Sequence, residues 1–159
     1  MTKKNTALLT VVLLMAFLVG CGPKAPDVDW TLKITGEVAT PLELSYADLA
    51  GMDQIDLNDI LMEKSTGEDV VTSWTGVPLA DLLTKAGAAE DYVSITAIAA
   101  DGYSIEITKE ELTGGIIALK DAGEWIATTS EDKGPIRLVT PSTPANRWVY
   151  AIMEIQVNK

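Results

Sequence analysis

Few side chains in this sequence are of the types that carry out covalent or metal chemistry. The 159 residues include no histidine and one cysteine, Cys21. Ser142 lies between Pro141 and Pro144 and has no imidazole base available, so a Ser-His-Asp triad is excluded. A zinc site built from cysteine and histidine is excluded by the same absence.

Carboxylates are abundant, but their spacing does not define a metal site. Asp56, Asn58 and Asp59 lack the glycine and the distal glutamate of a calcium-binding EF-hand loop. We interpret them, together with Asp53, as a solvated acidic edge. Three tryptophans, Trp74, Trp125 and Trp148, could line a ligand cleft, because aromatic side chains favour pockets. The alternative is that they belong to the hydrophobic core.

The N-terminus has the pattern of a targeting segment. Lys3 and Lys4 precede an apolar run, 7–19, that is shorter than the roughly 20 residues of a membrane-spanning helix. The run ends in Leu-Val-Gly-Cys at 18–21, which resembles the lipobox of bacterial lipoproteins. This resemblance implies that residues 1–20 are a signal peptide, that Cys21 is the lipidated N-terminus and that the membrane anchor lies on the extracytoplasmic face. An ordinary signal peptide or an uncleaved anchor is the alternative.

The remaining chain has the length of one domain and a strongly acidic composition. Removal of 1–20 leaves 139 residues with 10 basic and 23 acidic side chains, a net charge of −13. Such a charge disfavours nucleic acid as a partner. We expect residues 21–29, which are rich in proline and aspartate, to be a tether, and residues 30–159 to form the domain.

The clearest helix signal lies near the middle of the chain. Pro78 suits a first helical turn, Leu79, Leu82, Leu83 and Ala86 fall on one helical face, and Gly87 can end the helix in the left-handed conformation. Two further short helices are expected. Ser45 and Asp48 have the spacing of an N-terminal cap, and Thr108 to Glu111 has that of a capping box closed by the glycines at 114–115.

Alternating apolar residues predict strands on both sides of the central helix. A hairpin is expected over 55–71, and a second hairpin over 93–107, because an Asp-Gly turn at 101–102 separates two alternating runs. Further strands are expected at 30–35, 42–44, 116–119, 136–139 and 153–157. The sequence therefore predicts a strand-rich α+β domain with mixed sheets and three short helices.

Six motifs, none specific alone, follow one another along this domain. They are Trp30-x-Leu-x-Ile-x-Gly36, Leu44-Ser-Tyr-x-Asp-Leu49, Trp74-x-Gly-Val-Pro-Leu-x-x-Leu-Leu-x-x-Ala-Gly87, Asp101-Gly-Tyr103, Gly134-Pro-Ile-Arg-Leu-Val-x-Pro141 and Arg147-Trp-Val149. In this order they resemble the molybdopterin-binding domain of the sulfite oxidase family. The resemblance covers about residues 30–157 and implies a mixed-sheet fold with a molybdenum-pterin cofactor in a cleft.

The residues of this chain match the family pattern only in part. In the family a cysteine before the Trp-x-Gly element ligates molybdenum, but here residues 56–73 contain no cysteine, and Met62 is their only soft ligand. The family's lysine after Arg-Trp-Val is Tyr150. Arg137 and Arg147 match positions that can lie near the pterin phosphate. Trp148 directly follows Arg147, and Trp74 opens the Trp-x-Gly motif.

Two functions follow from this pattern. In the first, the protein is a lipid-anchored extracytoplasmic molybdopterin-binding protein of a molybdopterin-dependent oxidoreductase system, with Arg137, Arg147, Trp74 and Trp148 at the cofactor. In the second, it is a non-catalytic lipoprotein that keeps the fold without the metal site and binds a pterin, another small anion or a partner. Arg137 and Arg147 are then either anion ligands or structural partners of some of the 23 acids.

Overall fold

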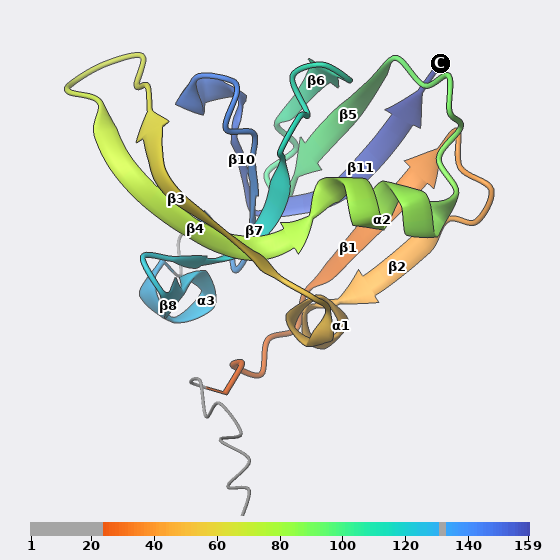
Figure 1. The fold of residues 1–159 in the computed structure, drawn as a ribbon. Coiled ribbons are helices and arrows are strands. Elements are labelled where there is room, and N and C mark those ends of the chain that lie inside the picture. Colours follow the sequence, from red (N-terminus) through yellow and green to blue (C-terminus); the bar gives the residue numbers. More distant parts are fainter. Residues whose placement is uncertain (1–23, 131–132) are drawn as a thin grey trace, which may run out of the picture.

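The computed structural model describes residues 24–130 and 133–159. The predicted signal peptide and Cys21 therefore lie outside the described residues. Within them, no helix has both the length and the apolar character needed to span a membrane. The chain folds into two sheets that share a core, as Figure 1 shows.

The first sheet contains both the first and the last strand of the domain. Its order is β2 (Leu42–Ser45), β1 (Thr31–Gly36), β11 (Ile152–Asn158), β5 (Ser94–Ala99) and β6 (Ser104–Thr108). β1 and β11 pair in parallel, and the other neighbours pair antiparallel. β5 and β6 form the hairpin predicted from the Asp-Gly turn, with Gly102 at a φ of 85°.

The second sheet carries the long hairpin at the left of Figure 1. Its order is β10 (Val149–Tyr150), β9 (Arg137–Val139), β7 (Ile116–Asp121), β4 (Val70–Pro78) and β3 (Ile55–Met62), and the short β8 (Glu124–Trp125) also pairs with β7. All of these strands pair antiparallel. The hairpin of β3 and β4 confirms the prediction over 55–71.

β7 is buried on both faces because hydrophobic clusters lie on either side of it. Ile117 and Leu119 belong to the main core, which also takes in the first sheet. Ile116 and Ala118 point the other way, as alternation along a strand requires, and pack with Trp74, Val139 and Trp148. We call this smaller group the tryptophan cluster.

The central helix is present with the predicted face. In α2 (Leu79–Ala86) the four predicted side chains are at most 5% exposed, and Gly87 ends the helix at a φ of 66°. Pro78 is the N-cap rather than a first-turn residue, because β4 continues as far as Pro78 and the chain turns directly from strand to helix. α1 (Tyr46–Gly51) begins at Ser45 with the predicted capping box to Asp48.

The prediction of a third helix after Thr108 is wrong. The capping contacts exist, since the Thr108 amide donates to a Glu111 carboxylate oxygen at 2.8 Å, but residues 109–114 form turns. Only the Leu112 amide reaches back four residues, to the Thr108 carbonyl, and Gly114 then takes a φ of 72°. One such bond is too few to propagate a helix. The third helix is α3 (Ile126–Thr129), and a 3-10 turn, η2, covers Ala145–Arg147.

Candidate functional site

Arg137 is the most unusual charged residue of the domain. It is the first residue of β9 and points into the tryptophan cluster, where it is only 3% exposed. Its guanidinium carbon lies 3.6 Å from the ring centre of Tyr150 and 5.1 Å from those of Trp74 and Trp148. Among the described residues no hydrogen-bond acceptor or ion-pair partner contacts it, and its Nε is buried without a partner.

The surroundings of Arg137 disfavour its charge. Burial lowers the pKa of Arg137 to about 10, and the nearby Tyr150 and Asp121 offset this only in part. Asp121 is a neighbour on β7 rather than a bonded partner, and burial raises the pKa of its carboxyl. Arg137 is therefore a positive charge at neutral pH that is solvated mainly by the faces of three aromatic rings.

Tyr150 covers this cation from the outer side. It lies on β10, paired with Arg137 itself, and is 37% exposed. The ammonium group of Lys133 is 5.4 Å from the centre of the same ring, so Tyr150 contacts two cations. In the sequence, Tyr150 stands out only as a departure from the family pattern. Its role depends on the β9–β10 register, which local sequence does not reveal.

Trp74 and Trp148 form the walls of the Arg137 site and are not open to solvent. Their rings pack edge to face at 6.0 Å, and they are 4% and 3% exposed. The indole N–H of Trp74 donates to Thr72, and that of Trp148 donates to the carbonyls of Thr140 and Thr143. Both rings are thus fixed by packing and hydrogen bonds.

Trp125 does not join these two tryptophans. It belongs to the main core, with its ring 6.3 Å from that of Tyr46 and 4.4 Å from the Lys120 ammonium. The hypothesis that three tryptophans line one cleft is therefore wrong. Trp74 and Trp148 form the smaller cluster instead, where they contact Arg137.

Arg147 has different neighbours from Arg137. Its guanidinium donates to Glu111 at 2.6 Å and to the Glu106 carbonyl at 2.9 Å. The backbone hydrogen bond from Thr108, followed by the bonds from Arg147 and the Thr108 hydroxyl, lowers the pKa of Glu111. Arg147 is thus the structural partner of an acid, one of the two roles that the sequence left open. Glu111, which the capping-box pattern picks out in the sequence, was the signal from which this ion pair could have been predicted.

The stretch in which the family carries its molybdenum ligand is the β3–β4 hairpin. Here Leu57, Ile60 and Met62 turn toward the tryptophan cluster and pack against it. Apolar side chains therefore fill the space beside Trp74 and Trp148. Among the described residues no group of three or more histidine, cysteine, aspartate or glutamate side chains is close enough together to hold a metal ion.

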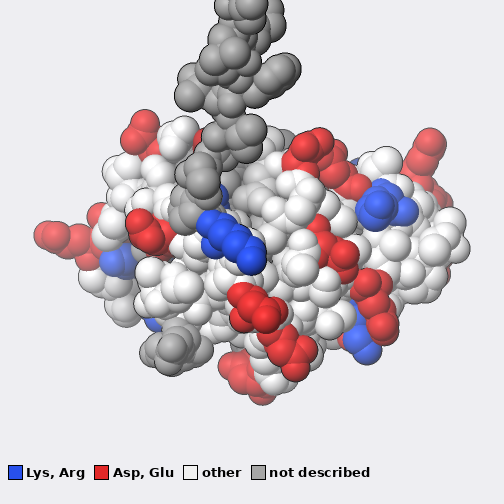
Figure 2. Space-filling view, turned by 90° about the horizontal axis from the view of Figure 1, so that it is seen from below, with Lys and Arg blue, Asp and Glu red and all other residues white. Residues whose placement is uncertain are grey.

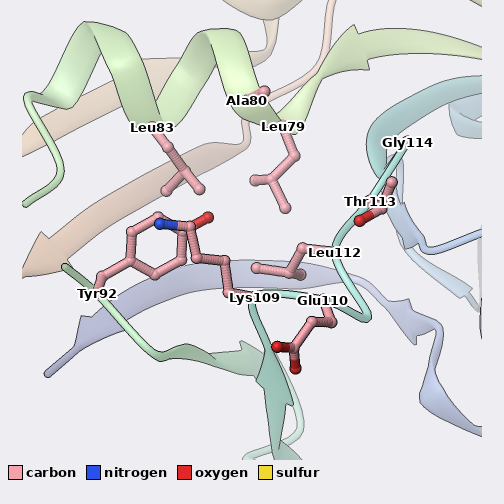
Figure 3. Close-up of a pocket in the computed structure, with 9 residues that line it drawn as sticks. All are labelled: Leu79, Ala80, Leu83, Tyr92, Lys109, Glu110, Leu112, Thr113 and Gly114. Atoms are coloured by element: carbon pink, nitrogen blue, oxygen red, sulfur yellow. The ribbon is translucent and has the colours of Figure 1, made fainter. Parts of the chain in front are cut away.

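Two hollows of the surface are not lined by Arg137. A groove of about 450 Å³ runs between α2 and the turns after β6, with Leu79 and Leu83 pointing into it from the helix and Leu112 from the opposite side, as Figure 3 shows. Lys109 crosses the groove, donates to the Glu90 carbonyl at 2.7 Å and lies over the Tyr92 ring. A second hollow, of about 250 Å³, lies between β3 and residues 141–144. Arg137 lines neither of them.

The two mainly antiparallel sheets with three short helices form an α+β domain, and its structure matches a sulfite-oxidase-like fold. A sequence model of the oxidoreductase molybdopterin binding domain matches residues 21–159, and the chain belongs to this family. The sulfane dehydrogenase SoxCD from Paracoccus pantotrophus has a similar structure, with a TM-score of 0.73 and 21% sequence identity. The match covers 86% of this chain and 40% of the other, so this chain spans well under half of that protein's length.

These findings confirm the predicted fold class and the family resemblance. The family binds molybdopterin, but the residues at the matching place in this chain do not fit a thiolate-ligated molybdenum centre. The β3–β4 hairpin supplies no thiolate, and its inward side chains are apolar. Arg137 has the charge that a phosphate needs, yet Tyr150 lies directly over it.

Proposed function

We propose that this protein is a lipid-anchored, extracytoplasmic member of the family that acts as a non-catalytic binding protein. The observation that carries this proposal is the combination of a β3–β4 hairpin that turns only apolar β3 side chains toward the tryptophan cluster with an enclosed Arg137. The hairpin lacks the cysteine thiolate that ligates molybdenum in this family. The enclosed Arg137 remains as a cation that has no acidic partner among the described residues. The lipid anchor rests on the sequence around Cys21.

The proposed ligand class is a small anion, and a pterin phosphate belongs to this class. Arg137 supplies one buried donor group, and Lys133 lies on the same tyrosine ring. A charge-assisted hydrogen bond contributes about 1.5–3 kcal/mol, so one or two of them give weak, salt-sensitive binding. Binding at Arg137 requires the Tyr150 ring to move aside. Arg147 takes no part, because its charge is paired with Glu111 and its Nη2 already donates to that carboxylate and to the Glu106 carbonyl.

The second candidate is that the protein holds molybdopterin for a molybdopterin-dependent oxidoreductase system. The family membership of residues 21–159 favours it. It differs from the first candidate in requiring a retained pterin. Both candidates share the fold, the anchor and the cation at Arg137.

Metal and pterin analysis of the purified mature protein separates the two. The protein is exported by cells with an intact cofactor pathway and analysed without a metal-binding tag. We expect no stoichiometric molybdenum and no retained pterin, together with salt-sensitive binding of inorganic pyrophosphate that Arg137→Met abolishes. Retained pterin without molybdenum supports the second candidate. One molybdenum atom per chain overturns the non-catalytic proposal and makes Met62 the first ligand to replace.

The anchor is tested separately with Cys21→Ser. Because Cys21 is the only thiol and stands at the expected cleavage point, the variant should be unprocessed or released from membranes. If the serine variant is processed and membrane-bound like the original protein, the lipoprotein interpretation is wrong.

A further inference from the structure

The described part of the expected tether does not hang free of the domain. Ala25 and Val28 are partly buried against the main core, and so is Trp30. The Trp30 amide donates to the Val28 carbonyl, and its indole N–H donates to the Ile152 carbonyl at 3.0 Å. We call residues 24–29 the docked segment, because the burial of Ala25 and Val28 and the indole bond of the adjoining Trp30 hold it on the surface.

The docked segment lies at the end of the domain that carries α1. Residues 24–27 and the α1 residues Ala47, Ala50 and Gly51 together line a hollow of about 560 Å³. Figure 1 shows the segment leaving beneath α1, on the side opposite the tip of the β3–β4 hairpin and the C-terminus. In Figure 2 this end of the molecule shows acidic and basic residues interspersed with large uncharged areas.

Docking shortens the connection between the domain and an anchor on Cys21. A residue spans at most about 3.6 Å, so the three steps from Cys21 to Lys24 cover no more than about 11 Å, whatever their conformation. If all residues from 21 to 29 were free, the same connection would reach about 30 Å. A domain of this length has a radius of gyration of roughly 14 Å. The anchored domain can therefore neither stand away from the bilayer nor turn over.

We propose that the α1 end of the domain is its membrane-facing surface, and that the tip of the β3–β4 hairpin points away from the bilayer. This inference rests on the lipid anchor of the proposed function. The occupant of the α1 end is the lipid headgroup layer, because the described chain begins at that end with Lys24, three residues after Cys21. The strongly acidic composition gives no electrostatic attraction to anionic lipid, so the short connection, and not charge, sets the orientation.

The chain offers a direct test, because lipidation uses its only native thiol. An introduced cysteine is then the one site for a thiol-reactive fluorophore. Gly51→Cys places the label at the α1 end, where nothing lies within 4 Å of an added Cβ, and Ser65→Cys places it in the exposed turn of the hairpin. Each lipidated full-length protein is reconstituted into phosphatidylcholine vesicles that carry a headgroup nitroxide quencher.

We expect several-fold stronger quenching at position 51 than at position 65. As a control, a flexible insertion of about ten glycine and serine residues between Pro23 and Lys24 lengthens the connection beyond the docked segment, and should bring the two values together. Equal quenching without the insertion, in protein that co-sediments with the vesicles, overturns the orientation alone. Protein that is not lipidated and does not co-sediment overturns the anchor and, with it, this inference.

Discussion

Replacement of Arg137 by methionine tests whether the enclosed arginine stabilises the fold. Methionine keeps an unbranched apolar side chain among Trp74, Trp148 and Tyr150, and removes only the charged head. Arg137→Ala is the matched control, because it removes the head and most of the side chain. The two variants therefore separate the charge from the volume.

The structure gives the expected change in the free energy of unfolding for each variant. A fall in the pKa of Arg137 from 12.5 to about 10 corresponds to a cost of about 3 kcal/mol for keeping the charge in the folded protein, at about 1.4 kcal/mol per pKa unit. The three ring contacts return about 0.5–2 kcal/mol each. These terms nearly cancel, so we expect Arg137→Met to change the free energy of unfolding by less than about 1.5 kcal/mol. Arg137→Ala leaves a cavity and should cost about 2–5 kcal/mol.

Urea unfolding of both variants, followed by tryptophan fluorescence, measures the difference. We expect methionine to be at least about 0.5 kcal/mol more stable than alanine, since a buried charge replaced by an apolar group of similar volume is often neutral. If the two variants lose the same stability, the charge itself holds the cluster together. Arg137 would then be a structural residue, and the argument that it is kept for an anion would be refuted.

Three further variants test other parts of the structure. Leu82→Ala should destabilise the protein by about 2–5 kcal/mol, whereas Asp81→Ala on the exposed side of α2 should stay within about 0.5 kcal/mol; equal losses in urea would contradict the assigned face. Gly76→Ala should unfold more easily than any exposed alanine variant, because the added Cβ meets the backbone of β7; an unchanged urea midpoint would refute this close packing. Arg147→Ala should raise the pKa of Glu111 in an NMR titration. Because the pKa of Glu111 is lowered in the folded protein, its contribution to stability is present near neutral pH and is lost as pH falls through the folded pKa. Arg147→Ala should therefore lose less stability on acidification than the original protein. A Glu111 pKa that the substitution leaves unchanged would contradict the ion pair.

Local patterns in the sequence predicted the elements that local physics determines. The face of α2, its end at Gly87 and the Asp-Gly hairpin all depend on residues close together in the chain, and the structure contains them. The helix expected after Thr108 does not form. A capping box satisfies the first amides of a helix but does not supply the hydrogen bonds that continue it. Its glutamate instead contacts Arg147, which lies far along the chain.

The site around Arg137 was only partly predictable for a related reason. Arg137 and the two tryptophans were recognised as candidates from their motifs. Their mutual enclosure, however, depends on β9 lying between β7 and β10, a pairing of distant segments. Tyr150 is placed over the guanidinium only by that register. Local sequence patterns can thus identify the residues of such a site, but they do not show whether the site is open to solvent.

The parallel pairing of β1 with β11 has a consequence for how the chain reaches its fold. β11 consists of residues 152–158 and lies in the middle of the first sheet, between β1 and β5. β1 has no partner on that side until β11 has been made and has joined the sheet. Contacts of such long sequence separation fold slowly. The incomplete chain therefore keeps an open sheet edge, and chaperones have their longest opportunity to bind it before the final strand closes the sheet.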